Sequence, residues 1–197
     1  MNSKILDLGC GKNKVTGSIG LDNVPLDGVD IIHDLLSIPY PLKDNSFDKI
    51  YLRNVLEHFL LEDINKILSE CYRLLSSNGN LIITIPHAFS VAAYTDITHK
   101  SYFTFNSGKF FDKTHPQSFY KKTYKYDFNL VKIDCKTCWF DWKGRLLRKF
   151  DLIFSKLANK QLSNALKNIK KPSLADRIVK KRSFQFVEIK WNFKKVN

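Results

Sequence analysis

The chain has 197 residues and a mass of 22.9 kDa, and apolar residues make up 44% of it while charged residues make up 26%. This composition is typical of a globular domain and excludes a disordered, collagen-like or disulfide-scaffold chain. The sequence lacks the run of about 18 apolar residues that a membrane-spanning helix requires, and no secretory signal opens it. Four cysteines without an export signal favour the cytoplasm, where thiols stay reduced.

The net charge of +13 is confined to the last quarter of the chain. Residues 1–142 carry 16 basic and 16 acidic residues, whereas residues 143–197 carry 16 basic and 3 acidic residues. Such an asymmetry bears on the surface and its partners, and it says nothing about the fold.

Short strand-like segments alternate with loops and a helix through the first half. The predicted strands are the apolar runs Ile5–Leu8, Ile19–Asp22, Val29–Ile32, Phe47–Leu52 and Leu81–Ile85. Apolar residues at helical spacing predict a helix from Leu60 to Leu75, which Asn78 and Gly79 are expected to end. Strands that alternate with crossover segments predict a parallel sheet.

The second half divides into a loop, two strands and the helices between them. Residues 88–114 have no clear period and are predicted to form a structured lid or acceptor loop, followed by a helix at Ser118–Tyr126. Strands are predicted at Leu130–Trp142 and Ser183–Phe193. Between these strands, residues 143–182 are predicted to form a basic helical insertion, because apolar residues recur there at helical spacing with Lys and Arg between them.

A glycine turn after the first strand is the clearest sign of a ligand site. Gly9 and Gly11 flank Cys10 there, and glycine lets a backbone take positive φ and approach a ligand closely. Ligands of such sheets bind at the carboxyl ends of the strands, where Asp22 and Asp34 close the next two strands. A carboxylate can accept hydrogen bonds from both hydroxyls of a ribose. Since no phosphate-binding glycine motif is present, the pattern favours a nucleoside without phosphates.

Further segments fit the same interpretation in order and spacing. The segments concerned are residues 5–11, 19–22, 29–35, 41–50, 54–58 and 70–81. Together they resemble a class I S-adenosylmethionine-dependent methyltransferase, in the branch that includes ubiquinone- and menaquinone-biosynthesis-like enzymes. The resemblance implies an α/β, Rossmann-like fold with a seven-stranded, mostly parallel sheet of order 3-2-1-4-5-7-6. Its last strand would be antiparallel, with the helical insertion before it, in a single domain spanning residues 1–197.

The resemblance also implies which residues contact the cofactor, S-adenosylmethionine. They are Asp7, Gly9, Cys10, Gly11, Asp22, Asp34, Leu35, Asn54 and Val55. Asp22 would hold the ribose, Asp34 and the Leu35 backbone the adenine, and Asn54 and Val55 the methionine end. The short polar loop at residues 12–18 predicts that the first crossover helix is reduced to a turn.

Four residues are candidates for a general base, which is needed only if the acceptor keeps a proton at neutral pH. They are His58, His87, Asp96 and His99, and the last three follow the fifth predicted strand, where the acceptor is expected. The alternative is that Asp96 and His99 only stabilise the loop through local hydrogen bonds. No metal is expected, because His87, Asp96 and His99 have no recognised metal-ligand spacing.

The basic insertion is open to three interpretations. Residues 143–182 carry 13 basic and 2 acidic residues. The preferred interpretation is a cap that packs on the protein, the next is a helix on an anionic membrane surface, and the third is an anionic partner such as RNA. Nucleic acid comes last because the aromatic and basic residues of an RNA-binding module are not interleaved here.

The leading functional hypothesis is therefore methyl transfer from S-adenosylmethionine to an oxygen or nitrogen of a small or lipid-linked acceptor, in the cytoplasm or peripherally at a membrane. One alternative is an RNA or protein methyltransferase that docks through the basic insertion. The other is a non-catalytic partner subunit with the same fold. The sequence does not define the oligomeric state.

Overall fold

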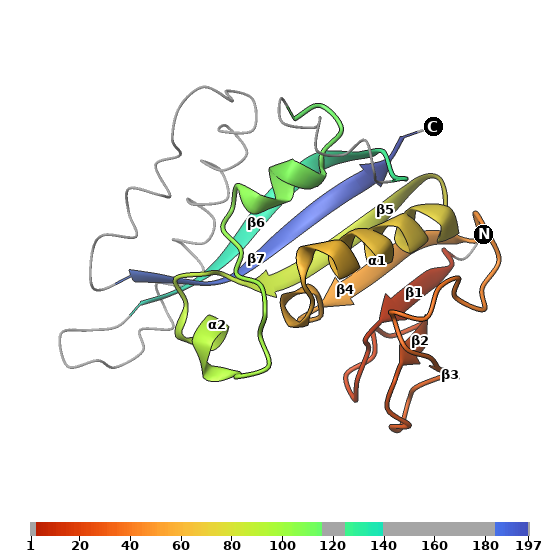
Figure 1. Ribbon diagram of the computed structural model, residues 1–197, viewed down its shortest axis with the longest axis horizontal. Helices are drawn as coiled ribbons and strands as arrows, with labels where there is room; N and C mark the ends of the chain where they lie inside the picture. The colour runs from red at the N-terminus through yellow and green to blue at the C-terminus, as the bar shows by residue number, and fades with distance from the viewer. Residues whose placement is uncertain (1–2, 116–124, 140–183, 197) are drawn as a thin grey trace.

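The computed structural model describes residues 3–115, 125–139 and 184–196 (Figure 1). Within these residues, seven strands form one sheet in the order β3-β2-β1-β4-β5-β7-β6. The strands are β1 (Ile5–Leu8), β2 (Ser18–Asp22), β3 (Ile31–Ile32), β4 (Phe47–Arg53), β5 (Leu75–Pro86), β6 (Phe128–Trp139) and β7 (Phe184–Lys195). The pairs from β3 to β5 are parallel, and β7 is antiparallel to both β5 and β6. The predicted fold class and strand order are confirmed. The predictions for residues 118–124 and 143–182 lie outside the described residues.

The long helix α1 (Leu61–Leu74) packs on the sheet beside β5 (Figure 1). Its buried residues recur every three or four positions, as one face of a helix requires. They include Ile64, Ile67, Leu68, Cys71 and Leu74. The predicted helix is thus confirmed to within one residue at each end. Among the described residues, no helix is both long and apolar enough to cross a membrane.

The segment that follows α1 differs from the prediction. Leu75 already pairs with Phe47 of β4, so β5 begins where the helix ends, six residues before the expected start. Asn78 adopts a φ of 62° in the left-handed region, and a Cβ at Gly79 would lie 2.9 Å from the Leu75 side chain. The Asn-Gly pair therefore shapes an irregularity inside β5, and it does not end the helix. An Asn-Gly pair is common both at a helix end and in a strand irregularity. Only the pairing of Leu75 with Phe47 shows which of the two forms here.

The segment between β5 and β6 is more regular than expected. It contains a short helix, α2 (Val91–Thr95), and a 3-10 turn, η2 (Ser107–Phe111). A Cβ at Gly108 would lie 2.6 Å from the indole of Trp191 in β7, so η2 packs closely on this buried ring. Phe103 and Phe111 are buried against the same ring. The later half of the predicted lid is therefore core.

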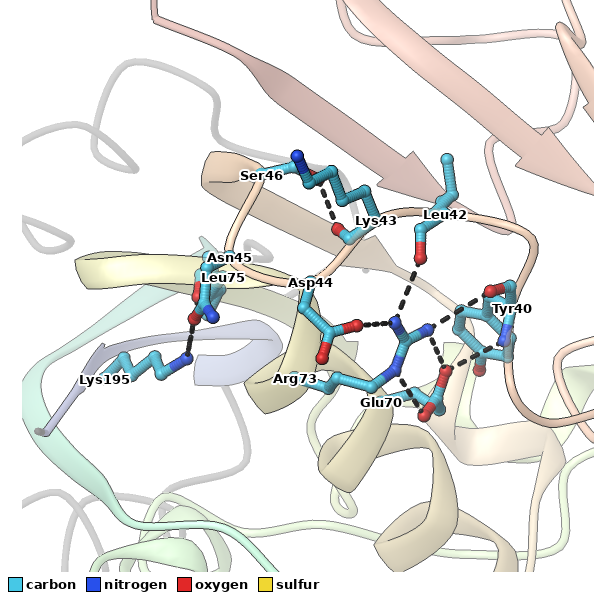
Figure 2. Close-up of polar contacts among 10 residues, drawn as sticks. All are labelled: Tyr40, Leu42, Lys43, Asp44, Asn45, Ser46, Glu70, Arg73, Leu75 and Lys195. Atoms are coloured by element: carbon cyan, nitrogen blue, oxygen red, sulfur yellow. Dashed lines mark hydrogen bonds and ion pairs between the residues drawn. The ribbon is translucent and has the colours of Figure 1, made fainter.

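Arg73 is the centre of a polar network that ties α1 to the loop before β4 (Figure 2). Its guanidinium pairs with Glu70 at 2.6 Å and with Asp44, and it donates to the main-chain oxygens of Tyr40 and Leu42 at 3.2 and 3.0 Å. Glu70 also accepts a hydrogen bond from the Tyr40 N–H at 2.8 Å. Burial raises the pKa of Glu70, but the hydrogen bonds from Arg73 and Tyr40 outweigh it, so the pKa lies below its ordinary value.

The network also reaches the end of the sheet. The buried hydroxyl of Tyr40 donates to the main-chain oxygen of Leu35 at 2.9 Å. Leu35 lies in the loop after β3, beside Asp34, which the sequence singled out as a ligand contact. The Arg73 network therefore holds the chain at a point where the candidate site is expected.

We expect Arg73→Met to lower the free energy of unfolding by about 2–4 kcal/mol, because it leaves Glu70 largely buried without its charged partner. Urea denaturation of the purified protein measures this change. The matched control is Lys66→Met, which breaks an exposed ion pair with Asp63 on the same helix and should cost less than about 1 kcal/mol. Equal losses in the two variants would contradict the structural role of the network.

The same network predicts a pH dependence. Because the pKa of Glu70 is lower in the folded state, its contribution is complete above its unfolded pKa of about 4.3 and is lost as the pH falls through the folded value. The stability gap between the wild type and Glu70→Gln should therefore narrow in urea titrations below about pH 4. A gap that stays constant down to about pH 2 would contradict the shift.

Candidate active site

A cavity of about 250 Å³ lies at the carboxyl ends of the parallel strands. Its lining contains six of the residues predicted to contact the cofactor: Gly9, Asp22, Asp34, Leu35, Asn54 and Val55. It also contains Asn23, His58 and Phe59, of which the sequence had suggested only His58, and that as a base. The structure thus brings together residues from four separate segments of the chain, as parallel strands with a shared carboxyl edge allow.

Gly9 is required at the floor of this cavity by two independent constraints. Its φ is +64°, a conformation that residues with a side chain rarely adopt. A Cβ at this position would also lie 2.6 Å from Cγ2 of Val55, which follows β4. The bare backbone of Gly9 and the side chain of Val55 therefore fit together only because no side chain stands between them.

Three of the predicted contacts, Asp7, Cys10 and Gly11, are not among the residues that line the cavity. The fully buried Asp7 accepts hydrogen bonds from the Val15 N–H at 2.8 Å and from Arg53 at 2.7 Å. It fixes the loop at residues 12–17, which forms turns as predicted in place of a helix. The Asp7 carboxylate thus bonds to the loop and to β4, and its predicted contact with the cofactor stays a prediction.

The two acidic residues of the lining are oriented by the main chain. Asp22 accepts hydrogen bonds from the N–H groups of Gly11 at 2.8 Å and Val24 at 3.1 Å. Asp34 accepts one from the N–H of Leu36 at 2.9 Å. A carboxylate has about four acceptor positions, so each retains capacity for a ligand. Gly11 thus affects the cavity indirectly, because its N–H orients the Asp22 carboxylate.

A second, larger cavity of about 870 Å³ adjoins the first. Its lining is Asn54, Glu57, His58, Pro86, Ala92, Thr95, Asp96, Ile97, His99, Val187 and Glu188. Asn54 and His58 line both cavities, so the two spaces meet at these side chains. Asn54 has a φ of 53°, and its N–H donates to the Thr84 oxygen of β5 at 2.8 Å. Asparagine tolerates this left-handed conformation better than most residues, which explains its presence at the junction.

Three of the four predicted base candidates lie in the larger cavity. The rings of His58 and His99 are 4.8 Å apart, and Thr98 links His58 to Asp96 through hydrogen bonds of 2.9 and 2.6 Å. Burial, with the neighbouring His99, lowers the pKa of His58. Asp96 and His99 also stabilise the loop, as the alternative interpretation expected, since His99 bonds to the Ala93 oxygen at 2.8 Å.

The fourth candidate, His87, is not in the cavity lining. It is 1% exposed, its ring packs 4.5 Å from that of Phe105, and its Nδ1 accepts a hydrogen bond from the Phe89 N–H. His87 therefore lies in the aromatic core, and its role as a base stays a prediction. Its N–H still bonds to the Val187 oxygen at 3.1 Å, and the chain turns only after it, at Ala88 and Phe89.

Sequence reasoning passed over Glu57, although it lies next to His58 in the 3-10 turn η1 (Leu56–His58) after β4. Its side chain is 2% exposed and lines the larger cavity. Burial raises its pKa to about 7. The one available signal was an acidic residue embedded in an otherwise apolar turn at the carboxyl edge of the sheet.

Part of the sequence is similar to known methyltransferases. Residues 21–83 match the family described as a methyltransferase domain. Over 105 residues, which are 42% of this chain, the sequence is 31% identical to phosphoethanolamine N-methyltransferase of Plasmodium falciparum, and the match spans 39% of that relative's length.

Two solved structures share the fold over nearly the whole chain. A SAM-dependent methyltransferase from Archaeoglobus fulgidus matches with a TM-score of 0.62 at 18% identity, covering 98% of this chain and 86% of that one. The YcgJ protein of Bacillus subtilis matches with a TM-score of 0.53 at 16% identity, covering 100% and 93%. The chain therefore has the fold of these methyltransferase structures, as the sequence motifs predicted, and its residues 21–83 match the methyltransferase-domain family. Its position in the ubiquinone-like branch stays a prediction.

We expect Gly9→Ala to weaken the binding of S-adenosylhomocysteine, the demethylated cofactor, by about ten-fold or more, because the new methyl group displaces Val55 and strains the turn. Isothermal titration calorimetry measures the affinity. The matched control is Gly17→Ala, which has the same strain at a φ of +77° but no atom within 4 Å of the new Cβ. Unchanged affinity in Gly9→Ala, or an equal loss in both variants, would contradict the assignment of this turn to the ligand site.

Proposed function

We propose that this chain transfers the methyl group of S-adenosylmethionine to an oxygen or nitrogen atom of a small or lipid-linked acceptor. The observation that carries the proposal is the junction of the two cavities at Asn54 and His58. A cofactor in the smaller cavity and an acceptor in the larger one would meet there, and close alignment of the reactants is the main requirement of this reaction.

The lining of the smaller cavity supports a defined orientation of the cofactor. The ribose would bind Asp22, whose carboxylate is held in place by the Gly11 N–H, and the adenine would lie beside Asp34 and Leu35. The methionine end would then extend past Gly9 toward Asn54. In this orientation the methyl group would point toward Asn54 and His58, the residues that line both cavities.

The chemistry needs little from the protein beyond this alignment. A lone pair of the acceptor forms a bond to the methyl carbon as the carbon–sulfur bond breaks, and S-adenosylhomocysteine leaves with the electron pair. An acceptor that keeps a proton at neutral pH must also lose it, and the polar groups that line the larger cavity include the predicted bases His58, Asp96 and His99.

The name of the Plasmodium relative supplies a first acceptor to test, phosphoethanolamine. The basic segment at residues 143–182 lies outside the described residues, and its contact with an anionic membrane surface remains a proposal. Such a contact would suit a lipid-linked acceptor, whereas RNA docking through the same segment is the weaker alternative.

The proposal is tested by following S-adenosylhomocysteine formation over a panel of hydroxyl and amine acceptors that includes phosphoethanolamine. With an accepted substrate, Asp22→Ala should lower kcat/KM by about 100-fold or more, because it removes the charged partner of the ribose. The exposed Glu62→Gln serves as the control and should retain activity. A wild-type protein that fails to bind S-adenosylmethionine would contradict the proposal, as would full activity in Asp22→Ala.

A further inference from the structure

Three metal-ligating side chains gather at the wall of the larger cavity. They are Glu57 and His58 from η1 and His99 from the loop after α2. One donor atom from each residue lies within 4.8 Å of the other two. Ligand atoms approach a transition-metal ion to about 2.0–2.2 Å, so an ion could bind all three after small side-chain rotations.

The Glu57 carboxylate is a buried group that lacks a counterpart. The side chain is 2% exposed, and neither carboxylate oxygen has a hydrogen-bond partner among the residues that the structure describes. The N–H groups of Lys100 and Ser101 bond to the main-chain oxygen of Glu57 and leave its side chain unpaired. Burial of a carboxylate without a partner costs free energy, and a cation between it and the two imidazoles would offset that cost.

The hydrogen bonds of both imidazoles leave one ring nitrogen of each with a free lone pair. His99 Nδ1 lies 2.8 Å from the Ala93 carbonyl oxygen, which can only accept, so Nδ1 carries the proton and Nε2 keeps a lone pair. The Thr98 hydroxyl donates its one proton to Asp96 at 2.6 Å, so its oxygen accepts from His58 Nδ1 at 2.9 Å. His58 Nε2 therefore also keeps its lone pair. Metal-binding histidines typically donate their other N–H to a carbonyl or carboxylate in this way.

Asp96 adds to the negative charge around this group. Its Oδ2 lies 3.9 Å from His99 Nε2, and its other oxygen accepts a hydrogen bond from Thr98. The carboxylate is half exposed and faces the same cavity. Two carboxylates and two imidazoles in one wall form a donor set for a cation.

We propose that Glu57, His58 and His99 bind one divalent first-row transition-metal ion. Two imidazoles and one carboxylate suit Mn²⁺, Fe²⁺, Co²⁺ or Zn²⁺, and three protein ligands leave coordination positions open toward the larger cavity. Since His58 also lines the smaller cavity, an oxygen atom on the ion would lie beside the cavity junction.

The use of this ion rests on the proposed function, whereas its binding does not. A metal ion lowers the pKa of a coordinated hydroxyl group. The hydroxyl proton would pass to solvent, the oxygen would form the bond to the methyl carbon, and the carbon–sulfur bond would break. The site thus favours an acceptor with a metal-binding oxygen.

The test uses the full-length, tag-free protein after treatment with a chelator, titrated with Co²⁺ and followed by its visible absorption, and with Mn²⁺ followed by electron paramagnetic resonance. The wild type should bind about one equivalent, and Glu57→Gln and His99→Gln should each bind about ten-fold or more weakly. Glu62→Gln and His33→Gln are matched controls outside the cluster and should bind as the wild type does.

S-adenosylhomocysteine binding by calorimetry reports the folded state of each variant independently of the metal. Absence of Co²⁺ and Mn²⁺ binding in the wild type would overturn the metal site, as would equal binding in folded His99→Gln. Metal binding without any cofactor binding would leave the metal site standing and remove the proposed function, so the two failures are distinguishable.

Discussion

The close contact between the Gly9 backbone and the Val55 side chain is the constraint on which the site depends. A Cβ at Gly9 would lie 2.6 Å from Val55, so the turn after β1 and the turn after β4 can approach this closely only with glycine at the first position. The parallel pairing of β1 with β4 sets that distance. Asp22 is then fixed from the same turn through the Gly11 N–H, and Asn54 and His58 follow directly around Val55. The smaller cavity and the residues that it shares with the larger one are thus connected through this contact between neighbouring strands.

Polar groups behind this contact hold its two sides in place. Asp7 and Arg53 connect β1 to β4 through a 2.7 Å ion pair whose carboxylate is fully buried. On the other side, the Arg73 network holds Tyr40, whose hydroxyl fixes Leu35 in the cavity wall. Neither the Asp7–Arg53 ion pair nor the Arg73 network needs to touch a ligand in order to affect its binding. Asp7 is a motif residue of this kind: it holds the loop and β4 in place but does not line the cavity.

The fold and the grouping of Gly9, Asp22 and Asp34 around the smaller cavity could be predicted from the sequence because their signals are local. A short apolar run followed by Gly9, and acids such as Asp22 and Asp34 at the ends of the next strands, fix which residues lie at the carboxyl edge once the sheet is parallel. The start of β5 was mispredicted because Asn78 and Gly79 give the same signal at a helix end as in a strand irregularity. Only the pairing of Leu75 with Phe47 distinguishes them.

The lining of the larger cavity depends on packing, which a linear pattern does not contain. His87 looked equivalent to His99 in the sequence, yet one lies in the aromatic core and the other in the cavity wall. The importance of Glu57 follows from burial without a hydrogen-bond partner among the described residues, which depends on the whole surrounding structure. Its assembly with His58 and His99 joins segments that are about 40 residues apart, so no short motif announces it.

A crystal structure of the protein with S-adenosylhomocysteine would show whether the smaller cavity holds the cofactor. We predict the ribose on Asp22, the adenine beside Leu35 and the sulfur beside Asn54, facing the larger cavity. A ligand bound elsewhere, or one whose sulfur points away from the junction of the two cavities, would contradict it.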